Sequence, residues 1–185
     1  PGTMLPAPRV EAHAIVADRA AFGLPEGVPL LASFNNSYKL DRPLVEAWLA
    51  IARRVPHARF VVYLPAQARP RFAETWAALG GDPAALLLVD KLAPERHAVR
   101  AASCDLFLDA FRYQAGATAI AALEAGLPVL SRRGDSPLAR LGVSLNLALG
   151  LDALVADDAD DYVARAVALA LDPERLATLR GRLAS

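Results

Sequence analysis

The stretch Ala110–Pro128 reads AFRYQAGATAIAALEAGLP and follows a short apolar run that ends in Asp109. Small residues at Gly116 and Ala117 lead to Thr118, which opens a segment with the composition of a helix. After a strand, such a loop lets backbone N–H groups at a helix N-terminus converge on an anion, because no bulky side chain blocks the approach and the helix dipole favours negative charge. The pattern indicates a phosphate-binding turn. An ordinary strand-to-helix turn, in which small residues serve close packing, also fits this window.

Outward from this stretch, apolar runs and helical segments alternate along the chain. The runs expected to form strands are Leu30–Phe34, Arg59–Leu64, Leu86–Val89, Leu106–Leu108 and Val129–Ser131. The segments with helical spacing are Arg42–Arg54, with Asp41 as its expected N-cap, Arg69–Leu79, Pro94–Ala102, Thr118–Ala125, Asp158–Leu171 and Pro173–Leu183. Strands that are apolar throughout are typical of a parallel sheet with helices on both faces. The sequence therefore predicts an α/β fold, a doubly wound parallel sheet with two C-terminal helices.

Composition allows one hydrophobic core and argues against several classes of protein. The 185 residues are 55% hydrophobic and carry a formal net charge of zero, so no nucleic-acid-binding stripe or membrane-surface patch is indicated. No apolar run approaches the roughly 18–20 residues that span a bilayer. The single cysteine, Cys104, precludes an internal disulfide. Because no charged-then-apolar signal segment opens the chain, we expect a soluble, cytoplasmic protein without nucleic-acid or membrane partners.

Proline and small residues are frequent in residues 1–29, where the sequence PEGVP at Pro25–Pro29 marks a turn. We expect residues 1–29 to form an irregular lead-in or a connector between lobes. Residues 30–185 are expected to form a single lobe, because the strand and helix alternation begins there and continues to the C-terminus.

Charged and polar residues follow several predicted strands, and in open α/β sheets ligands bind beyond these carboxyl ends. The mobile ammonium group of Lys39 suits a diphosphate, although a single lysine is also commonly a solvated surface group. His97 and Arg100 lie three residues apart on one helix face, where they could hold a flat heterocycle or form a surface pair. No GxGxxG or Walker-type sequence is present, which argues against a nicotinamide dehydrogenase and a P-loop nucleotidase.

Four segments together resemble a known family. They are FNNSYKLDRPLVEAWLAIARRVPHARFVVYL from Phe34, LAPERHAVRAASCDLFLD from Leu92, YQAGATAIAALEAGLPVLS from Tyr113 and SPLARLGVSLN from Ser136. In their order and spacing they resemble the C-terminal catalytic lobe of O-linked N-acetylglucosamine transferases, the SPINDLY-like glycosyltransferases that carry tetratricopeptide repeats. The resemblance implies the Rossmann-like C-terminal half of a GT-B fold and inverting, metal-independent transfer from a nucleotide sugar, usually UDP-N-acetylglucosamine, to Ser or Thr hydroxyls of proteins.

The resemblance also implies roles for individual residues. The family's donor-binding glutamine and lysine fall on Asn36 and Lys39, and Lys39 would stabilise the leaving diphosphate as the catalytic residue. The histidine and arginine that hold uracil fall on His97 and Arg100. Arg140 matches a basic position of the family, with a structural salt bridge as the alternative.

In the glycine-rich turn the chain departs from the family. Thr118 keeps the family's threonine, whereas a histidine position is Gly116 and a further threonine position is Ala117. Their backbone N–H groups would still serve the donor. The acidic residue that commonly binds ribose falls on Ala121, and Glu124, one helical turn further along, is the expected substitute.

The first function expected is the UDP-sugar-binding lobe of a protein O-glycosyltransferase, without a metal or a further cofactor. The acceptor protein and the catalytic base would be bound by a missing N-terminal lobe and repeats. The chain alone would therefore be inactive, and its exposed lobe face would be prone to self-association. The alternative is a degenerate GT-B lobe that acts as a non-catalytic binding or regulatory module. A third reading, an unrelated α/β nucleotide-sugar enzyme such as an epimerase, has no motif in its support.

Overall fold

The computed structural model describes residues 15–183, so residues 1–14 and 184–185 lie outside the described part. Six strands form one parallel sheet in the order β3-β2-β1-β4-β5-β6. The strands are β1 (Leu30–Ser33), β2 (Arg59–Tyr63), β3 (Leu86–Val89), β4 (Leu106–Leu108), β5 (Val129–Arg132) and β6 (Val155–Ala156). The predicted doubly wound parallel sheet is confirmed. The strand order reverses between β1 and β4, which places the expected ligand crevice at their carboxyl ends.

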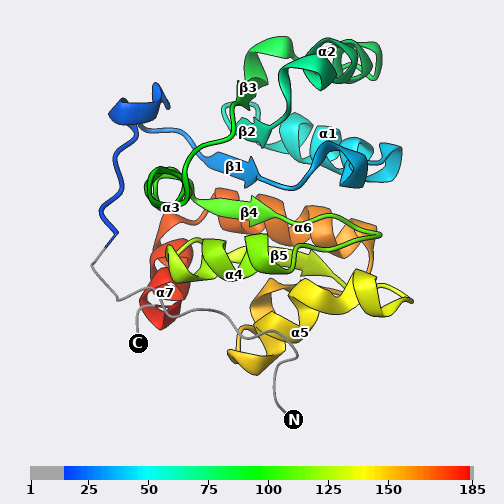
Figure 1. The fold of residues 1–185 in the computed structure, drawn as a ribbon. Coiled ribbons are helices and arrows are strands. Elements are labelled where there is room, and N and C mark those ends of the chain that lie inside the picture. The colour runs from blue at the N-terminus through cyan, green and yellow to red at the C-terminus, as the bar shows by residue number, and fades with distance from the viewer. Residues whose placement is uncertain (1–14, 184–185) are drawn as a thin grey trace.

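Seven α-helices cover the sheet. They are α1 (Arg42–Arg54), α2 (Arg69–Ala78), α3 (Pro94–Ala102), α4 (Ala117–Glu124), α5 (Leu141–Ala148), α6 (Ala159–Ala170) and α7 (Pro173–Leu183), counted within residues 15–183. The helices α1 and α6 pack together on one face, and α3 and α4 pack together on the other (Figure 1). Two short 3₁₀ turns matter for the site: η2 (Ser37–Lys39) follows β1, and η5 (Pro137–Arg140) precedes α5.

Local sequence explains why α1 forms where it does. The Asp41 carboxylate accepts a hydrogen bond from the Leu44 backbone N–H at 3.2 Å, as expected of an N-cap, and Pro43 occupies the first turn. Leu44 and Trp48 on the inner face of the helix are fully buried. Burying apolar side chains of this size stabilises the fold by about 1.5–3 kcal/mol each, so the amphipathic pattern fixes the helix against the sheet.

The structure adds two elements that the sequence did not predict. The α5 segment Leu141–Ala148 is apolar on nearly every side, so it lacks the one-sided periodicity that identifies a surface helix. The β6 strand Val155–Ala156 is too short to give a pattern of its own. Several predicted boundaries also move by one residue, because the last residues of strands and helices depend on hydrogen bonds to neighbouring elements.

The described part of the predicted lead-in, residues 15–29, is irregular apart from the 3₁₀ turn η1 (Ala20–Phe22). The Arg19 guanidinium fastens it to the start of β4, with Nη2 at 2.9 and 2.8 Å from the two carboxylate oxygens of Asp105. Arg19 also donates to the carbonyls of Ser103, Pro25 and Val28 at 3.1 Å. This segment therefore lies at the amino edge of the sheet, the edge at which the strands begin.

Candidate functional site

Asp109 is the centre of the carboxyl edge, the edge at which the strands end. It directly follows β4, is fully buried and is surrounded by hydrogen-bond donors. Its Oδ1 accepts from the backbone N–H groups of Ala110 and Ala115 at 2.8 Å and from Asn35 Nδ2 at 3.3 Å, and its Oδ2 accepts from Ser131 Oγ at 3.1 Å. Burial raises the pKa of Asp109 to about 6 despite these bonds. One carboxyl group therefore holds together the residues that follow β1, β4 and the middle of β5.

Lys39 reaches from η2 to the β4–α4 loop, residues 109–116. Its Nζ donates to the backbone carbonyl of Gln114 at 3.1 Å and lies 4.0 Å from the centroid of the Tyr113 ring. Burial lowers the pKa of Lys39, and the nearby charge of Asp109 partly opposes this effect. The structure thus brings together the segments that follow β1 and β4, as the sequence predicted. Asn36 lies one turn earlier, is exposed and makes no side-chain capping bond to η2.

The N-terminus of α4 opens at the same edge. Gly116 is its N-cap and supplies no side-chain acceptor, so the first backbone N–H groups of the helix, at Ala117 and Thr118, have no intrahelical partner. Ala117 is exposed and Thr118 is half-buried. The preceding N–H group, at Ala115, already donates to Asp109 and is not free for a ligand.

His97 and Arg100 form a packed cluster with Phe34 rather than a solvated surface pair. Arg100 is only 3% exposed, and its Nη1 donates to the carbonyl of Asp90 at 2.7 Å. Its Nη2 lies 3.2 Å from His97 Nδ1, and the His97 ring meets the Phe34 ring edge-on at 4.8 Å. Burial and the charge of Arg100 lower the pKa of His97 to about 4. Because a guanidinium can only donate, Nδ1 of the neutral imidazole accepts, which leaves a proton on Nε2.

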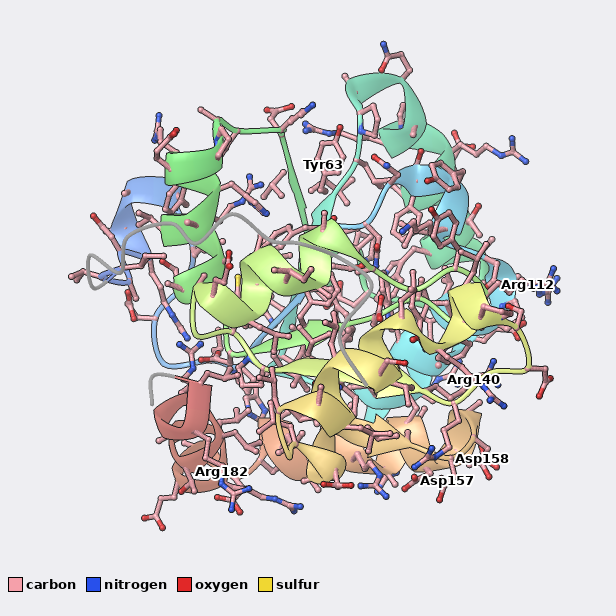
Figure 2. All side chains as sticks on the ribbon, turned by 60° about the horizontal axis from the view of Figure 1, so that its bottom comes forward. Tyr63, Arg112, Arg140, Asp157, Asp158 and Arg182 are labelled. Atoms are coloured by element: carbon pink, nitrogen blue, oxygen red, sulfur yellow. The ribbon has the colours of Figure 1, made fainter. Side chains whose placement is uncertain are left out.

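Two of the predicted residues lie away from this cluster. Glu124 is exposed and ends α4, seven residues beyond Ala117 and hence about 10 Å along the helix axis from the free N–H groups. Arg140 is exposed at the end of η5, where Figure 2 labels it, and its Nε donates to the carbonyl of Gly134 at 2.6 Å. The partner of Arg140 is therefore a main-chain carbonyl.

Sequence reasoning missed three buried polar residues that organise the edge: Asn35, Asp109 and Gln114. Each lies in a segment that was expected to reach the site, but none was chosen as a site residue. For Asn35 and Asp109 the available signal was a polar residue at the end of a wholly apolar strand, because such a position is buried and its side chain must find partners. The asparagine pair shows the difficulty, since the structure buries Asn35 and leaves Asn36 exposed.

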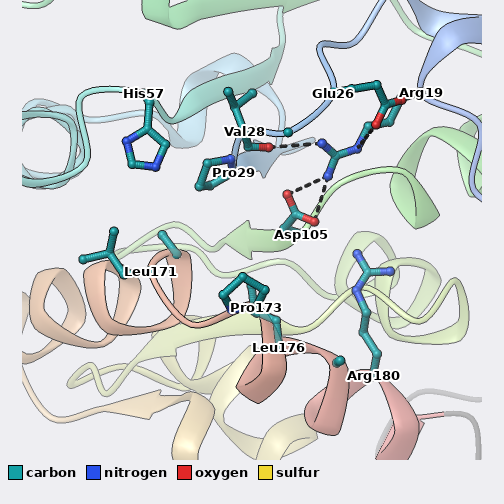
Figure 3. A pocket seen from close by; sticks show the side chains of 13 residues that line it. Arg19, Glu26, Val28, Pro29, His57, Asp105, Leu171, Pro173, Leu176 and Arg180 are labelled. Carbon is teal, nitrogen blue, oxygen red and sulfur yellow. Dashed lines mark hydrogen bonds and ion pairs between the residues drawn. The ribbon is translucent and has the colours of Figure 1, made fainter.

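A cavity of about 670 Å³ lies at the opposite, amino edge of the sheet (Figure 3). Its lining includes Arg19, His57, Asp105, Leu176 and Arg180, and none of the predicted site residues. The cavity therefore does not coincide with the candidate site. Within residues 15–183 there is also no group of three or more His, Cys, Asp or Glu side chains that could hold a metal ion. In the same described range, no helix combines the length and the apolar character needed to cross a bilayer.

Comparison with known proteins identifies relatives over most of the chain. The model of glycosyl transferase family 41 matches residues 6–185. The chain is 32% identical over 167 residues to a probable UDP-N-acetylglucosamine–peptide N-acetylglucosaminyltransferase, SEC, of Arabidopsis thaliana, covering 89% of this chain and 17% of that protein. It is 32% identical over 162 residues to the probable transferase SPINDLY of Solanum lycopersicum, covering 85% of this chain and 17% of that protein.

The fold matches a solved structure of a related enzyme. A point mutant of the O-GlcNAc transferase of Thermobaculum terrenum superposes with a TM-score of 0.82 and 25% sequence identity, over 85% of this chain and 31% of that chain. The sheet and its helices thus correspond to one Rossmann-like lobe of a GT-B glycosyltransferase. The chain spans about a sixth of the length of the curated relatives named above.

Proposed function

Because the chain belongs to glycosyl transferase family 41, we propose that it is the donor-binding lobe of a protein O-glycosyltransferase and holds the UDP part of a UDP-sugar at its carboxyl edge. The observation that carries the proposal is the contact between Lys39 Nζ and the Gln114 carbonyl. It places the cation of one strand end beside the loop that leads to the free N–H groups of α4.

In the proposed site, two groups of residues bind different parts of the donor. The diphosphate would be met by the Lys39 ammonium and by the N–H groups of Ala117 and Thr118, which are the donors that phosphate oxygens prefer. The uracil would lie near His97 and Phe34, where the imidazole offers an Nε2–H donor and flat ring surfaces. The proposal does not include Glu124, which ends α4 on the side away from these N–H groups.

The chemistry proposed for this lobe is stabilisation of the leaving group. When the bond between the sugar and UDP breaks, negative charge builds up on the diphosphate, and fixed positive groups lower the energy of that transition state. Lys39 is suited to this role because it is half-buried and held by a neutral carbonyl. Inverting, metal-independent transfer is supported by membership of the family and not by the geometry of the site. We assign the binding of the acceptor and the general base to parts of the protein beyond this lobe. The chain alone would then turn over no substrate.

A second candidate function is a non-catalytic binding or regulatory module. It is favoured by Gly116 and Ala121, which replace side chains that the family uses toward the donor, and Ala121 is an exposed methyl group in the structure. In this case the lobe keeps the fold but no longer binds the donor. The two candidates differ in whether the folded chain binds UDP.

Calorimetric or NMR titration of the chain with UDP tests the proposal. Replacing Lys39 by alanine should weaken UDP binding about tenfold or more, since one charge-assisted hydrogen bond is lost. Lys91→Ala is the matched control, because Lys91 is the chain's other lysine and is exposed. A folded wild-type chain that binds no UDP would support the non-catalytic module, and equal affinities in the two lysine variants would contradict the assigned site.

A further inference from the structure

Gln114 connects the β4–α4 loop to several elements that lie far from it in the sequence. It is fully buried, and its Oε1 accepts from the backbone N–H groups of Gly142 and Val143 at 2.9 and 3.3 Å, at the start of α5. Its Nε2 donates to the carbonyl of Arg132 at the end of β5, and its backbone N–H donates to the carbonyl of Leu138 in η5 at 2.9 Å. One residue thus ties the loop to β5, η5 and α5.

The one remaining polar group of Gln114, its backbone carbonyl, accepts from Lys39 Nζ. The Gln114 side chain and backbone N–H are fixed, and the next N–H along the chain, at Ala115, donates to Asp109. The peptide unit that contains the Gln114 carbonyl is therefore held from both ends. Lysine, in contrast, has a flexible four-carbon stem and takes the position that its partners impose. The Tyr113 ring, from the neighbouring residue, lies on the ammonium at 4.0 Å and completes a cradle on the same loop.

From this arrangement we propose that Gln114 is a positioning residue, whose buried side chain holds its own carbonyl in place so that this carbonyl holds Lys39 at the rim where the diphosphate binds. The diphosphate part of this inference rests on the proposed function. The cradle is neutral, since a carbonyl and an aromatic ring hold the ammonium without a direct bond to a carboxylate. A diphosphate oxygen, being charged, is a stronger acceptor and would draw the ammonium away from the Gln114 carbonyl.

The role is also compatible with the position of Asp109. This buried carboxylate attracts Lys39, but its two oxygens take their hydrogen bonds from backbone, amide and hydroxyl donors. The Gln114 carbonyl, rather than an Asp109 oxygen, is therefore the group that accepts directly from the ammonium. The sequence alone gave no reason to single out this glutamine, because all its partners lie 18 or more residues away along the chain.

Two lysines make the inference testable without a ligand. In protein labelled with ¹³C at the lysine ε-carbon, Lys39 and Lys91 give separate signals, and the ring current of Tyr113 should displace the Lys39 protons from the position of the exposed Lys91. In Gln114→Leu the Lys39 signal should move toward that of Lys91. The dissociation constant for UDP should rise about five- to tenfold, whereas that for uridine should change less than twofold, because the base cluster is untouched.

Asn146→Leu is the matched control. Asn146 is an equally buried amide whose Nδ2 donates to the carbonyls of Val129 and Leu154, with no link to Lys39. Its replacement should leave both lysine signals in place. If Gln114→Leu does not fold, Gln114→Glu keeps the acceptor for the N–H groups of α5 and replaces the donor to the Arg132 carbonyl by an acceptor, so a shift in the same direction is expected.

The outcomes separate this inference from the proposed function. An unmoved Lys39 signal in a folded Gln114 variant would overturn the positioning role. Unchanged UDP affinity in that variant, or equal losses for UDP and uridine, would overturn its link to the diphosphate. A Lys39 signal that moves in a chain that binds no UDP at all would overturn the proposed function while supporting the hold of Gln114 on Lys39.

Discussion

Two aspartates flank β4, and they show how differently the two edges of one sheet are used. Asp105, at the amino edge, forms an ion pair in which Arg19 Nη2 donates to both carboxylate oxygens, and it accepts the Leu30 backbone N–H at 2.7 Å. Asp109, at the carboxyl edge, is more deeply buried and has only uncharged donors as hydrogen-bond partners. The first carboxylate secures the incoming chain, and the second organises loops that hold Lys39.

The comparison shows that the cavity and the candidate site lie at opposite edges of the sheet. The cavity lies at the amino edge, where the Arg19 guanidinium is fully engaged by protein oxygens and Arg180 donates to the carbonyls of Ala102 and Cys104. At the carboxyl edge the N–H groups of α4 have no intrahelical acceptor. Donors that the fold does not consume are the ones available to a ligand, which favours the carboxyl edge.

The largest effect should come from removing the organising carboxylate. Asp109→Ala leaves two backbone N–H groups, one amide and one hydroxyl without their acceptor, and should lower the free energy of unfolding by about 3–4 kcal/mol. Urea denaturation at pH 7 measures this loss. A change below 1 kcal/mol would show that water replaces the carboxylate easily and that the two aspartates do not differ as described.

The pH dependence should show two opposing contributions. The pKa of Asp109 is raised to about 6, so the folded state binds this proton more tightly than the unfolded state does. Asp109 should therefore lower the free energy of unfolding by about 3 kcal/mol as pH rises from about 4 to 6. The pKa of His97 is lowered to about 4, so the unfolded state binds this proton more tightly than the folded state does. His97 should therefore lower the free energy of unfolding as pH falls from 6.5 to 4. The His97 contribution is smaller because the ring is only half-buried.

Single variants should separate these contributions. Asp109→Asn should become less stable on acidification between pH 6.5 and 4, and His97→Gln should become more stable between pH 6 and 4. Urea midpoints recorded across this range, compared with those of the wild-type chain, provide the measurement. Parallel pH profiles in all three proteins would contradict the burial assigned to both groups.

A substitution at the amino edge should change the stability of the fold without changing the affinity for UDP. Arg19→Ala removes the partner of Asp105 and the donors to three carbonyls, and should cost about 2 kcal/mol, since the pair is partly exposed. Its UDP affinity should equal that of the wild-type chain. Thermal unfolding and a UDP titration on the same sample test both statements, and a loss of UDP affinity would mean that the edges are coupled.

The smallest effect distinguishes two histidines. His97→Ala removes a ring that packs on Phe34 and should weaken UDP binding about tenfold, whereas His57→Ala, at the amino-edge cavity, should leave it unchanged. Calorimetric titration resolves a difference of this size. A weaker affinity in the His57 variant would move the candidate site to the cavity.

Local pattern was sufficient for most of the fold. The bounds of α1, α3, β3 and β4 were predicted to the residue, because the two helices show helical spacing and the two strands are short, continuous apolar runs. The family resemblance depended on four sequence segments in their order and spacing, and the family assignment is confirmed. The fit of individual residues to UDP stays a prediction.

Tertiary structure decided which polar residues share a site. The sequence placed Lys39 after one strand and the small-residue turn after another, but only the adjacency of β1 and β4 brings Lys39 into contact with the loop that leads to this turn. It also decided that Asn35 rather than Asn36 is buried, and that Gln114 is bonded to β5, η5, α5 and η2. Helical and strand periodicity can be recognised from residues that are close together in the sequence. These hydrogen bonds join residues that are far apart in the chain, so they form only when the strands have paired.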